Sequence, residues 1–325
     1  MKKRLHSTLR KCLFLLIVAL TSYFSSYSQL SAGNYFEAGF TAGPMVFLGD
    51  LGGHFGRGTS FLKDYNMKAT RLSFGAFIAA HPNELLGFRL ALNYGQLDGD
   101  DSYIKGKGGL EQARQNRNLD FRSQITEAFF AMEVYPTVLL EDDPTSLFGR
   151  LRPYGLIGVG VFHFNPQGTY TDPNTGGKTW VDLQPLHTEG EGFPQYPDRP
   201  NYSLTQINIP MGVGVKYFLS ESVNLSFEIV HRKTFTDYID DVSTTFVDPN
   251  LFYANLGAGQ AQIADVMSNK SPLRSNLVGA DYGPGGKRGD TGQKDAYFTA
   301  AFKIGIRLGS SREWDNSTRC PLLRF

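Results

Sequence analysis

Hydrophobic and polar side chains alternate along the stretch INIPMGVGVKYF, residues 207–218. One row of alternate positions is apolar from Ile207 to Tyr217, whereas the other row carries Asn208, two glycines and Lys216. A β-strand places alternate side chains on opposite faces. The pattern therefore predicts a strand whose two faces meet different surroundings.

The same period of two recurs along the chain. Seven segments have a clear apolar row and a clear polar row, and an eighth, residues 153–166, is glycine-rich and apolar on both rows, so its facing stays open. We expect no amphipathic helix of useful length after the first 28 residues. The predicted strands are residues 34–43, 70–81, 85–96, 125–136, 153–166, 207–218, 223–233 and 296–309.

Eight strands of this length fit a transmembrane barrel. A soluble β-sandwich is the alternative, because its strands alternate as well. Isolated charges on the polar rows favour the barrel, since a narrow lumen lets them pair while small neighbours leave room for them. The predicted lumen charges are Arg71, Arg89, Glu127, Glu133, Lys216, Glu228, Arg232, Lys303 and Arg307.

The connections also favour the barrel. Those after strands two, four and six are short to moderate, whereas residues 49–66, 97–120, 165–203 and 236–295 form long ones. Outer-membrane barrels have short periplasmic turns and long outer loops. The sequence therefore predicts an all-β fold, an eight-stranded antiparallel transmembrane β-barrel with long extracellular loops and a short periplasmic C-terminal tail. Long loops without structure are uncommon, so we expect these to fold over the barrel mouth or to pack on a neighbour.

The first 28 residues resemble a secretory signal peptide, with a basic start, an apolar core and small residues near Ser28. An uncleaved anchor is the alternative, although the core is short for one. We expect a signal peptide at 1–28, the barrel at 29–309 and a tail at 310–325. The mature chain would lie in the cell outer membrane, among its lipids, with both termini in the periplasm.

Composition narrows the function further. Five of the 32 Lys and Arg residues and none of the 31 Asp and Glu residues precede position 29, so the mature chain carries about −4. Nucleic-acid binding requires a basic surface, so we exclude that class. Cys320 is the one cysteine after the leader, which leaves either a free thiol or a bridge to another chain.

No motif predicts catalysis. NTGGKT at 174–179 lacks the first glycine of a phosphate loop, and the histidines lack a zinc spacing. GPGGKRGD at 283–290 is interpreted as a flexible loop. We expect no enzyme, no cofactor and no metal site. The acidic clusters are interpreted as solvated surface; they are Asp98, Asp100 and Asp101, then Asp142 and Asp143, then Asp237, Asp240 and Asp241.

Several stretches together resemble the PorG family, the small outer-membrane barrels of the type IX secretion system. They are FLGDLGG, RSQITEAFFAMEVYP, RPYGLIGVGVFHFNP, LQPLHTEGEG, FTDYIDDVSTTFVDP and a late RCP. The resemblance implies a structural part rather than an enzyme. Its implied partners are PorK-type lipoprotein and PorN-type subunits of the periplasmic ring, with other type IX secretion components.

The tail is the expected contact with that ring, because it is more apolar than a plain terminus requires. Its candidate contact residues are Trp314, Cys320, Pro321, Leu322 and Phe325. We hypothesise that Cys320 forms an intermolecular disulfide with the lipoprotein subunit. Two other functions stay open, a surface ligand-binding or adhesion barrel of OmpA-like type and a small pore.

Overall fold

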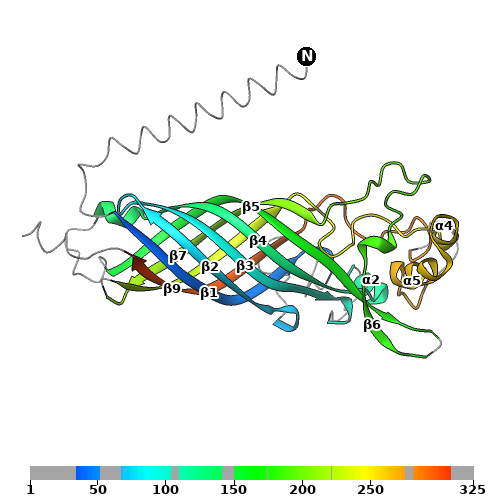
Figure 1. Ribbon diagram of the computed structural model, residues 1–325. Helices are drawn as coiled ribbons and strands as arrows, with labels where there is room; N and C mark the ends of the chain where they lie inside the picture. The colour runs from blue at the N-terminus through cyan, green and yellow to red at the C-terminus, as the bar shows by residue number, and fades with distance from the viewer. Residues whose placement is uncertain are drawn as a thin grey trace, which may run out of the picture.

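The computed structural model describes residues 34–51, 67–103, 110–140, 150–173, 175–220, 222–274 and 281–308. Eight long antiparallel strands form a closed barrel, and a ninth, short strand extends one side of it (Figure 1). The strands are β1 Tyr35–Leu48, β2 Arg71–His81, β3 Leu86–Asp100, β4 Asp120–Val134, β5 Leu151–Thr171, β6 Lys178–Asp182, β7 Thr205–Phe218, β8 Val223–Thr234 and β9 Ala296–Leu308.

Closure comes from pairing between the first and last strands. β1 pairs with β9, from Phe36 opposite Leu308 to Leu48 opposite Ala296. β4 pairs with β5, so no free edge remains around the barrel. A closed sheet satisfies the backbone hydrogen bonds that lipid cannot satisfy. The predicted fold class is therefore confirmed, and all eight predicted strands are present.

Strand β5 is longer than the sequence indicated. It runs for 21 residues to Thr171, where Gln167–Thr171 pair with β6. The expected loop at 165–203 therefore begins with a hairpin that continues the barrel wall. The pleat also settles the open facing of this strand, because Tyr154, Leu156 and Phe162 are buried while Val159 is exposed.

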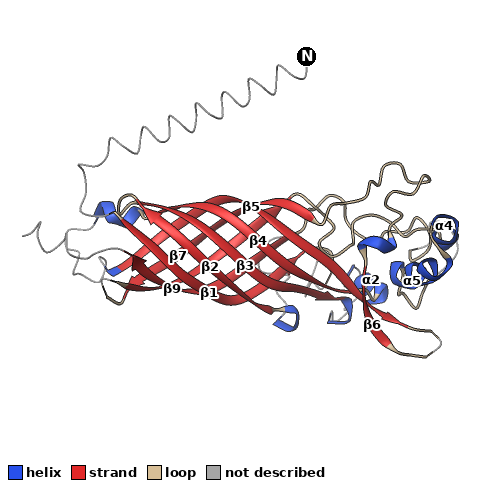
Figure 2. Cartoon of the chain, viewed as in Figure 1, coloured by secondary structure: helices blue, strands red, loops and turns tan. Residues whose placement is uncertain are grey.

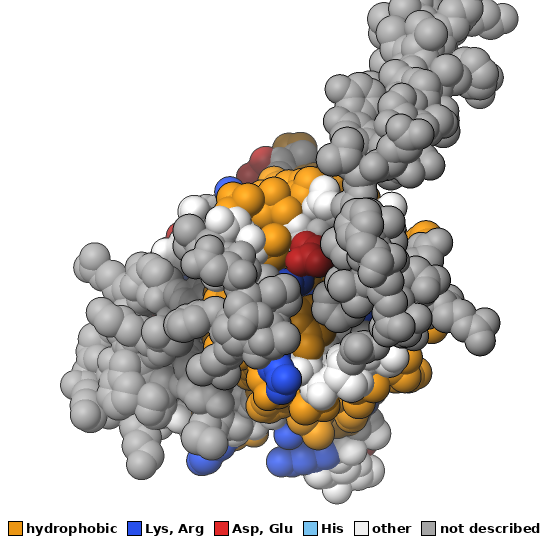
Figure 3. All heavy atoms as spheres, turned by 90° about the vertical axis from the view of Figure 1, so that its left-hand side faces the viewer, with side chains coloured by type: hydrophobic (Ala, Val, Ile, Leu, Met, Phe, Trp, Pro, Cys, Tyr) orange, Lys and Arg blue, Asp and Glu red, His pale blue; other side chains and the backbone are white. Residues whose placement is uncertain are grey.

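The outer face of the barrel is apolar. The row that contains Ile207 points outward, and Val213 in its middle is 65% exposed. Phe40, Ile78 and Phe302 lie on the corresponding rows of other strands and are also exposed. From one end of the barrel, hydrophobic side chains make up much of the described surface (Figure 3). A closed barrel with such an outer face spans a membrane.

The two ends of the barrel differ as predicted. The described connections at the short-turn rim are residues 82–85, 135–140 and 219–220, and the described parts of the long connections gather at the opposite, long-loop rim (Figure 1). We call the described residues of the long connections the cap. It comprises residues 49–51, 67–70, 101–103, 110–119, 172–173, 175–204, 235–274 and 281–295.

The cap contains helices that the sequence did not predict (Figure 2). They are α2 Leu110–Arg117, α4 Pro249–Asn255 and α5 Ala258–Ser268, with four 3-10 turns at Met67–Ala69, Asp101–Tyr103, Pro136–Leu140 and Gln184–Leu186 in the connections. Asp248 caps α4 by accepting a hydrogen bond from Asn250 N. The buried face of α5 consists of Ala261, Ala264, Met267 and Ser268, and these mostly small residues give a weak periodic signal. No helix in the described ranges is long and apolar enough to cross a membrane.

Candidate functional site

The middle of the lumen contains a cluster of paired charges. Arg89 Nη1 on β3 donates to Glu228 Oε2 on β8 at 2.9 Å, and Arg89 Nε lies 3.2 Å from Glu133 Oε1 on β4. Lys303 Nζ on β9 lies 3.4 Å from both carboxylates. The Tyr154 hydroxyl donates to Glu228 at 2.6 Å. Two acids and two bases therefore neutralise one another inside the barrel.

A second and a third group of charges lie on either side of this cluster. Towards the short-turn rim, Lys216 Nζ donates to Glu37 Oε2 at 2.8 Å. Towards the long-loop rim, Arg232 Nη2 lies 3.2 Å from Glu127 Oε2, and Asn208 donates to Glu127 Oε1 at 2.7 Å. Each carboxylate again meets a cation from another strand, so the charges fasten strands together across the lumen.

Seven of the nine predicted lumen charges are buried as expected, all except Arg71 and Arg307. Arg71 does not join them, because its side chain lies at the long-loop rim, is 46% exposed and pairs with Asp98 at 2.6 Å. Arg307 lies at the short-turn rim with its guanidinium against the rings of Tyr35 and Phe218. The tail residues Trp314, Cys320, Pro321, Leu322 and Phe325 lie outside the described residues.

Above the charged clusters, apolar side chains close the long-loop end of the lumen. They come from five barrel strands and from the cap, and Tyr297 joins them to the cluster around Glu127 by donating to its Oε1 at 3.2 Å. The buried members are Met45, Phe47, Leu51, Leu97, Leu119, Phe121, Ile125, Phe162, Phe164, Ile239, Val242 and Tyr297.

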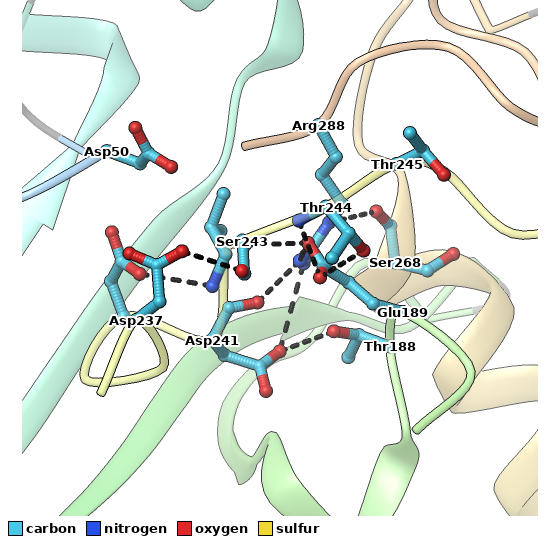
Figure 4. A network of polar contacts seen from close by, with 12 residues as sticks. Asp50, Thr188, Glu189, Asp237, Asp241, Ser243, Thr244, Thr245, Ser268 and Arg288 are labelled. Atoms are coloured by element: carbon cyan, nitrogen blue, oxygen red, sulfur yellow. Dashed lines mark hydrogen bonds and ion pairs between the residues drawn. The ribbon is translucent and has the colours of Figure 1, made fainter. Parts of the chain in front are cut away.

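A second polar site lies in the cap, where segments far apart in sequence meet (Figure 4). Arg288 Nη1 donates to Glu189 Oε1 at 2.9 Å and to the carbonyl oxygen of Asp241 at 2.5 Å. Glu189 also accepts hydrogen bonds from Ser243 N at 2.9 Å and Thr244 N at 2.8 Å. A single guanidinium and a single carboxylate therefore join three segments of two long connections.

Arg117 fastens the other two long connections to this site. Its Nε donates to Asp101 Oδ2 at 2.8 Å, its Nη2 to the Asp50 carbonyl at 2.8 Å and its Nη1 to the Arg288 carbonyl at 2.6 Å. All four long connections thus contribute to one hydrogen-bonded unit. Of the two alternatives for the long loops, folding over the barrel mouth is the one observed.

Burial in the cap changes the acidity of its carboxyl groups. Desolvation, helped by the charges of Asp241 and Glu189, raises the pKa of Glu191 to about 8. Desolvation also raises the pKa of Asp241 to about 6, although Arg288 opposes the shift, and raises the pKa of Asp237 to about 7. These groups take up protons in a pH range where ordinary carboxyls are fully ionised.

Two interpretations of the sequence are therefore wrong. Asp101, Asp237, Asp240 and Asp241 are buried rather than solvated, and the segment 283–290 is not a free loop, because it contains the buried Arg288. Asp142 and Asp143 lie outside the described residues. The signal that could have identified the site is the pairing of two acid-rich stretches, TEGE and DYIDD, with an arginine in a third.

In the described ranges, no group of three or more His, Cys, Asp or Glu residues could hold a metal ion. A polar cavity between the barrel mouth and the cap, lined in part by Asp240, Lys270 and Arg288, measures about 10 Å³. That volume holds one water molecule.

The chain is similar to solved outer-membrane proteins at low sequence identity. The Yersinia pestis attachment invasion locus protein Ail is 7% identical, with a TM-score of 0.33 over 86% of this chain and 100% of that chain. A major outer membrane protein of Thermus thermophilus is 13% identical, with a TM-score of 0.38 over 85% and 99%. Neisserial surface protein A is 11% identical, with a TM-score of 0.32 over 85% and 98%. No family model and no curated protein matches the chain, so the resemblance to the PorG family stays a prediction.

Proposed function

We propose that this chain is a non-catalytic outer-membrane barrel that anchors or scaffolds the periplasmic ring of the type IX protein secretion system. The observation that carries the proposal is the filled lumen. Three charged clusters and an apolar layer occupy it, and the cap covers its long-loop end. A barrel filled in this way favours a rigid anchor over a small pore.

The position of the last strand supports the rim that we propose for the ring contact. Strand β9 ends at Leu308 beside the turn 219–222, where Arg307 N donates to the Ser222 carbonyl at 2.8 Å. The last described residue therefore lies at the short-turn rim. In this proposal that rim faces the periplasm, and the tail with the short turns forms the contact for PorK-type and PorN-type subunits.

The test is affinity purification of the tagged, full-length chain from detergent-solubilised outer membranes. We expect ring subunits to co-purify with the wild-type chain and to be lost when residues 310–325 are deleted. The matched control deletes residues 175–177 in the turn of the β5–β6 hairpin, on the opposite rim, and should retain the subunits. If no ring subunit co-purifies with the wild-type chain, the scaffold proposal is wrong.

The same preparation tests the disulfide. On a non-reducing gel, we expect an adduct between the chain and a lipoprotein subunit that disappears with reductant and in Cys320→Ser. An adduct that persists in Cys320→Ser, or a wild-type band that reductant does not shift, contradicts the bridge but leaves the scaffold proposal intact.

A surface-binding barrel is the second candidate. Trp180 on β6 and Tyr253 on α4 are large side chains that the cap leaves exposed, and exposed aromatic residues are frequent at protein interfaces. Under this alternative, Trp180→Ala and Tyr253→Ala abolish a surface phenotype such as adhesion, while deletion of residues 310–325 has no effect on it.

A further inference from the structure

The cap has more buried acids than buried bases at one point. Glu189, Glu191 and Asp241 are each at most 2% exposed, and the buried Arg288 pairs with two of them, Glu189 and Asp241. A buried carboxylate without a matching cation is costly in free energy. The free energy of burying these three acids is therefore most favourable when at least one of them is protonated.

The hydrogen bonds show which carboxyl group lacks partners. Glu189 accepts from Arg288, Ser243 and Thr244, and Asp241 accepts from the hydroxyls of Thr188 at 2.5 Å and Tyr202 at 2.6 Å. Glu191 accepts from Glu189 N alone, at 3.2 Å, and its Oε1 has no hydrogen-bond partner among the described residues.

The backbone around these groups holds an uncommon conformation. Gly190 and Gly192, on either side of Glu191, have φ of 75° and 77°, and Asp241 has φ of 62°. Glycine adopts this left-handed region freely, but aspartate adopts it at a cost. Asp241 therefore keeps its conformation only while its contacts with Arg288, Thr188 and Tyr202 persist.

We propose that the cap is a pH-responsive closure. The carboxyl cluster of Glu189, Glu191 and Asp241 holds the long connections together around Arg288 while it retains its proton, and the cap loosens as that proton is lost in mildly alkaline solution. The proton is held on Glu191, since this group has neither a cation nor a full set of hydrogen-bond donors. The proposal does not depend on the secretion role.

Closure of the cap weakens as the pH rises, because burial raises the pKa of Glu191. In the closed cap the pKa of Glu191 is about 8, against an ordinary value of 4.5 when the loops are open and solvated. The closed form therefore binds the proton more tightly, and closure is strongest at acidic pH. Between pH 4.5 and 8, each pH unit weakens closure by about tenfold for this one proton, and the effect levels off above pH 8.

Two other acids near the cluster add to the pH dependence. The pKa of Asp241 is about 6, so its contribution levels off near pH 6, and the pKa of Asp237 is about 7, so its contribution continues to about pH 7. Desolvation raises the pKa of the Tyr238 phenol beyond this range. The remaining charged or titratable neighbours, from every segment packed here, are His187, Tyr196, Arg199, Tyr202 and Arg288.

The test measures hydrogen exchange of the full-length chain in detergent micelles at pH 6, 7 and 8, with rates corrected for intrinsic exchange. In residues 183–192 and 238–248, we expect the opening equilibrium to rise at least about 50-fold from pH 6 to pH 8, which is the contribution of Glu191 alone. Amides of β3 and β4 within the membrane should keep their protection. A rise of less than threefold in the cap segments overturns the proposal.

Glu191→Gln assigns the effect to one residue, because glutamine keeps the shape and cannot release a proton. We expect the rise of this variant from pH 6 to pH 8 to be about 50-fold smaller than that of the wild type, because Asp237 and Asp241 still release their protons. Glu84→Gln, at the exposed short-turn rim, is the matched control and should retain the full response. A rise in Glu191→Gln equal to that of the wild type would falsify the assignment to Glu191. If Glu191→Gln fails to fold, Thr188→Val, which removes one donor to Asp241, should open the cap at pH 6.

Discussion

Replacement of Arg89 by methionine tests whether ion pairs inside the lumen hold the barrel together. The Arg89 guanidinium is 1% exposed and lies 2.9 Å from Glu228 and 3.2 Å from Glu133. The ring centroids of Phe77 and Phe129 lie 5.9 and 5.5 Å from its central carbon. Methionine keeps most of the apolar stem but removes the charge and every donor.

The expected magnitude follows from the charge balance of the cluster. In the wild type, Arg89 and Lys303 neutralise Glu133 and Glu228; in the variant, one of the two buried carboxylates has no cation. Removal of one partner of a buried ion pair costs about 3–5 kcal/mol. Arg71→Met is the matched control, since its pair with Asp98 is 46% exposed on the arginine side and should contribute at most about 1 kcal/mol.

The assay is urea unfolding of the chain refolded in lipid vesicles, followed by the change in gel mobility that accompanies barrel unfolding. We expect Arg89→Met to lose at least about 3 kcal/mol and the double variant Arg89→Met with Glu228→Gln to recover at least about 1.5 kcal/mol of it, because the unpaired charge is gone. Equal stability of Arg89→Met and Arg71→Met, or no recovery in the double variant, would show that lumen pairing does not stabilise the barrel.

Four further predictions test other parts of the molecule. Val213→Arg should lower the free energy of unfolding in vesicles by about 2–4 kcal/mol, since Val213 faces lipid, and a neutral result would contradict the outward facing of that row. Gly212→Ala should prevent barrel assembly, because a Cβ there would lie 2.3 Å from the Ile229 carbonyl oxygen. Gly257→Ala should not, because a Cβ there would have no atom within 4 Å. Glu189→Gln should weaken Arg288 pairing and raise trypsin cleavage after Arg274 at least about tenfold, and unchanged cleavage would refute a structural role for that pair. The wild-type chain should give no stable conductance in planar bilayers; a steady channel would favour the pore instead.

The barrel could be predicted from sequence because its signal is local. A period of two over about ten residues defines a strand and both of its faces, and seven segments carried it cleanly. Strand β5 was ambiguous because two valines and an isoleucine on one row oppose two phenylalanines, a leucine and a tyrosine on the other, so hydrophobicity does not separate lipid from lumen there. Its extension beyond Pro166 depends on pairing with β6, which no single segment encodes.

The lumen charges were predictable for the same reason, but their partners were not. Arg89 and Glu228 lie 139 residues apart, and their contact depends on how the sheet closes. Arg71 belongs to the inward row by its position along the strand, yet it lies at the rim, where it turns to solvent and to Asp98. The alternating pattern predicts which face of the sheet a side chain lies on. It does not predict whether that side chain lies at the rim or in the middle of the barrel.

The cap could not be predicted, because burial of its acids depends on contacts between distant loops. Glu189 and Arg288 are 99 residues apart, and without that arginine an acidic stretch is most simply interpreted as solvated surface. The short helices α4 and α5 are defined by packing of Phe252, Ala264 and Met267 against the third connection rather than by periodicity.

The charge balance distinguishes the barrel from its cap. In the lumen, the four buried acids Glu37, Glu127, Glu133 and Glu228 meet four buried cations, one on each of β3, β7, β8 and β9. In the cap, Arg288 pairs with Glu189 and Asp241, and the neighbouring Glu191 has no ion pair among the described residues. A site with matched charges needs no proton to close, whereas a site with surplus acid does. The barrel should therefore unfold at the same urea concentration at pH 6 and pH 8 while the cap opens, and a parallel loss of barrel stability over that range would show that the two parts respond as one unit.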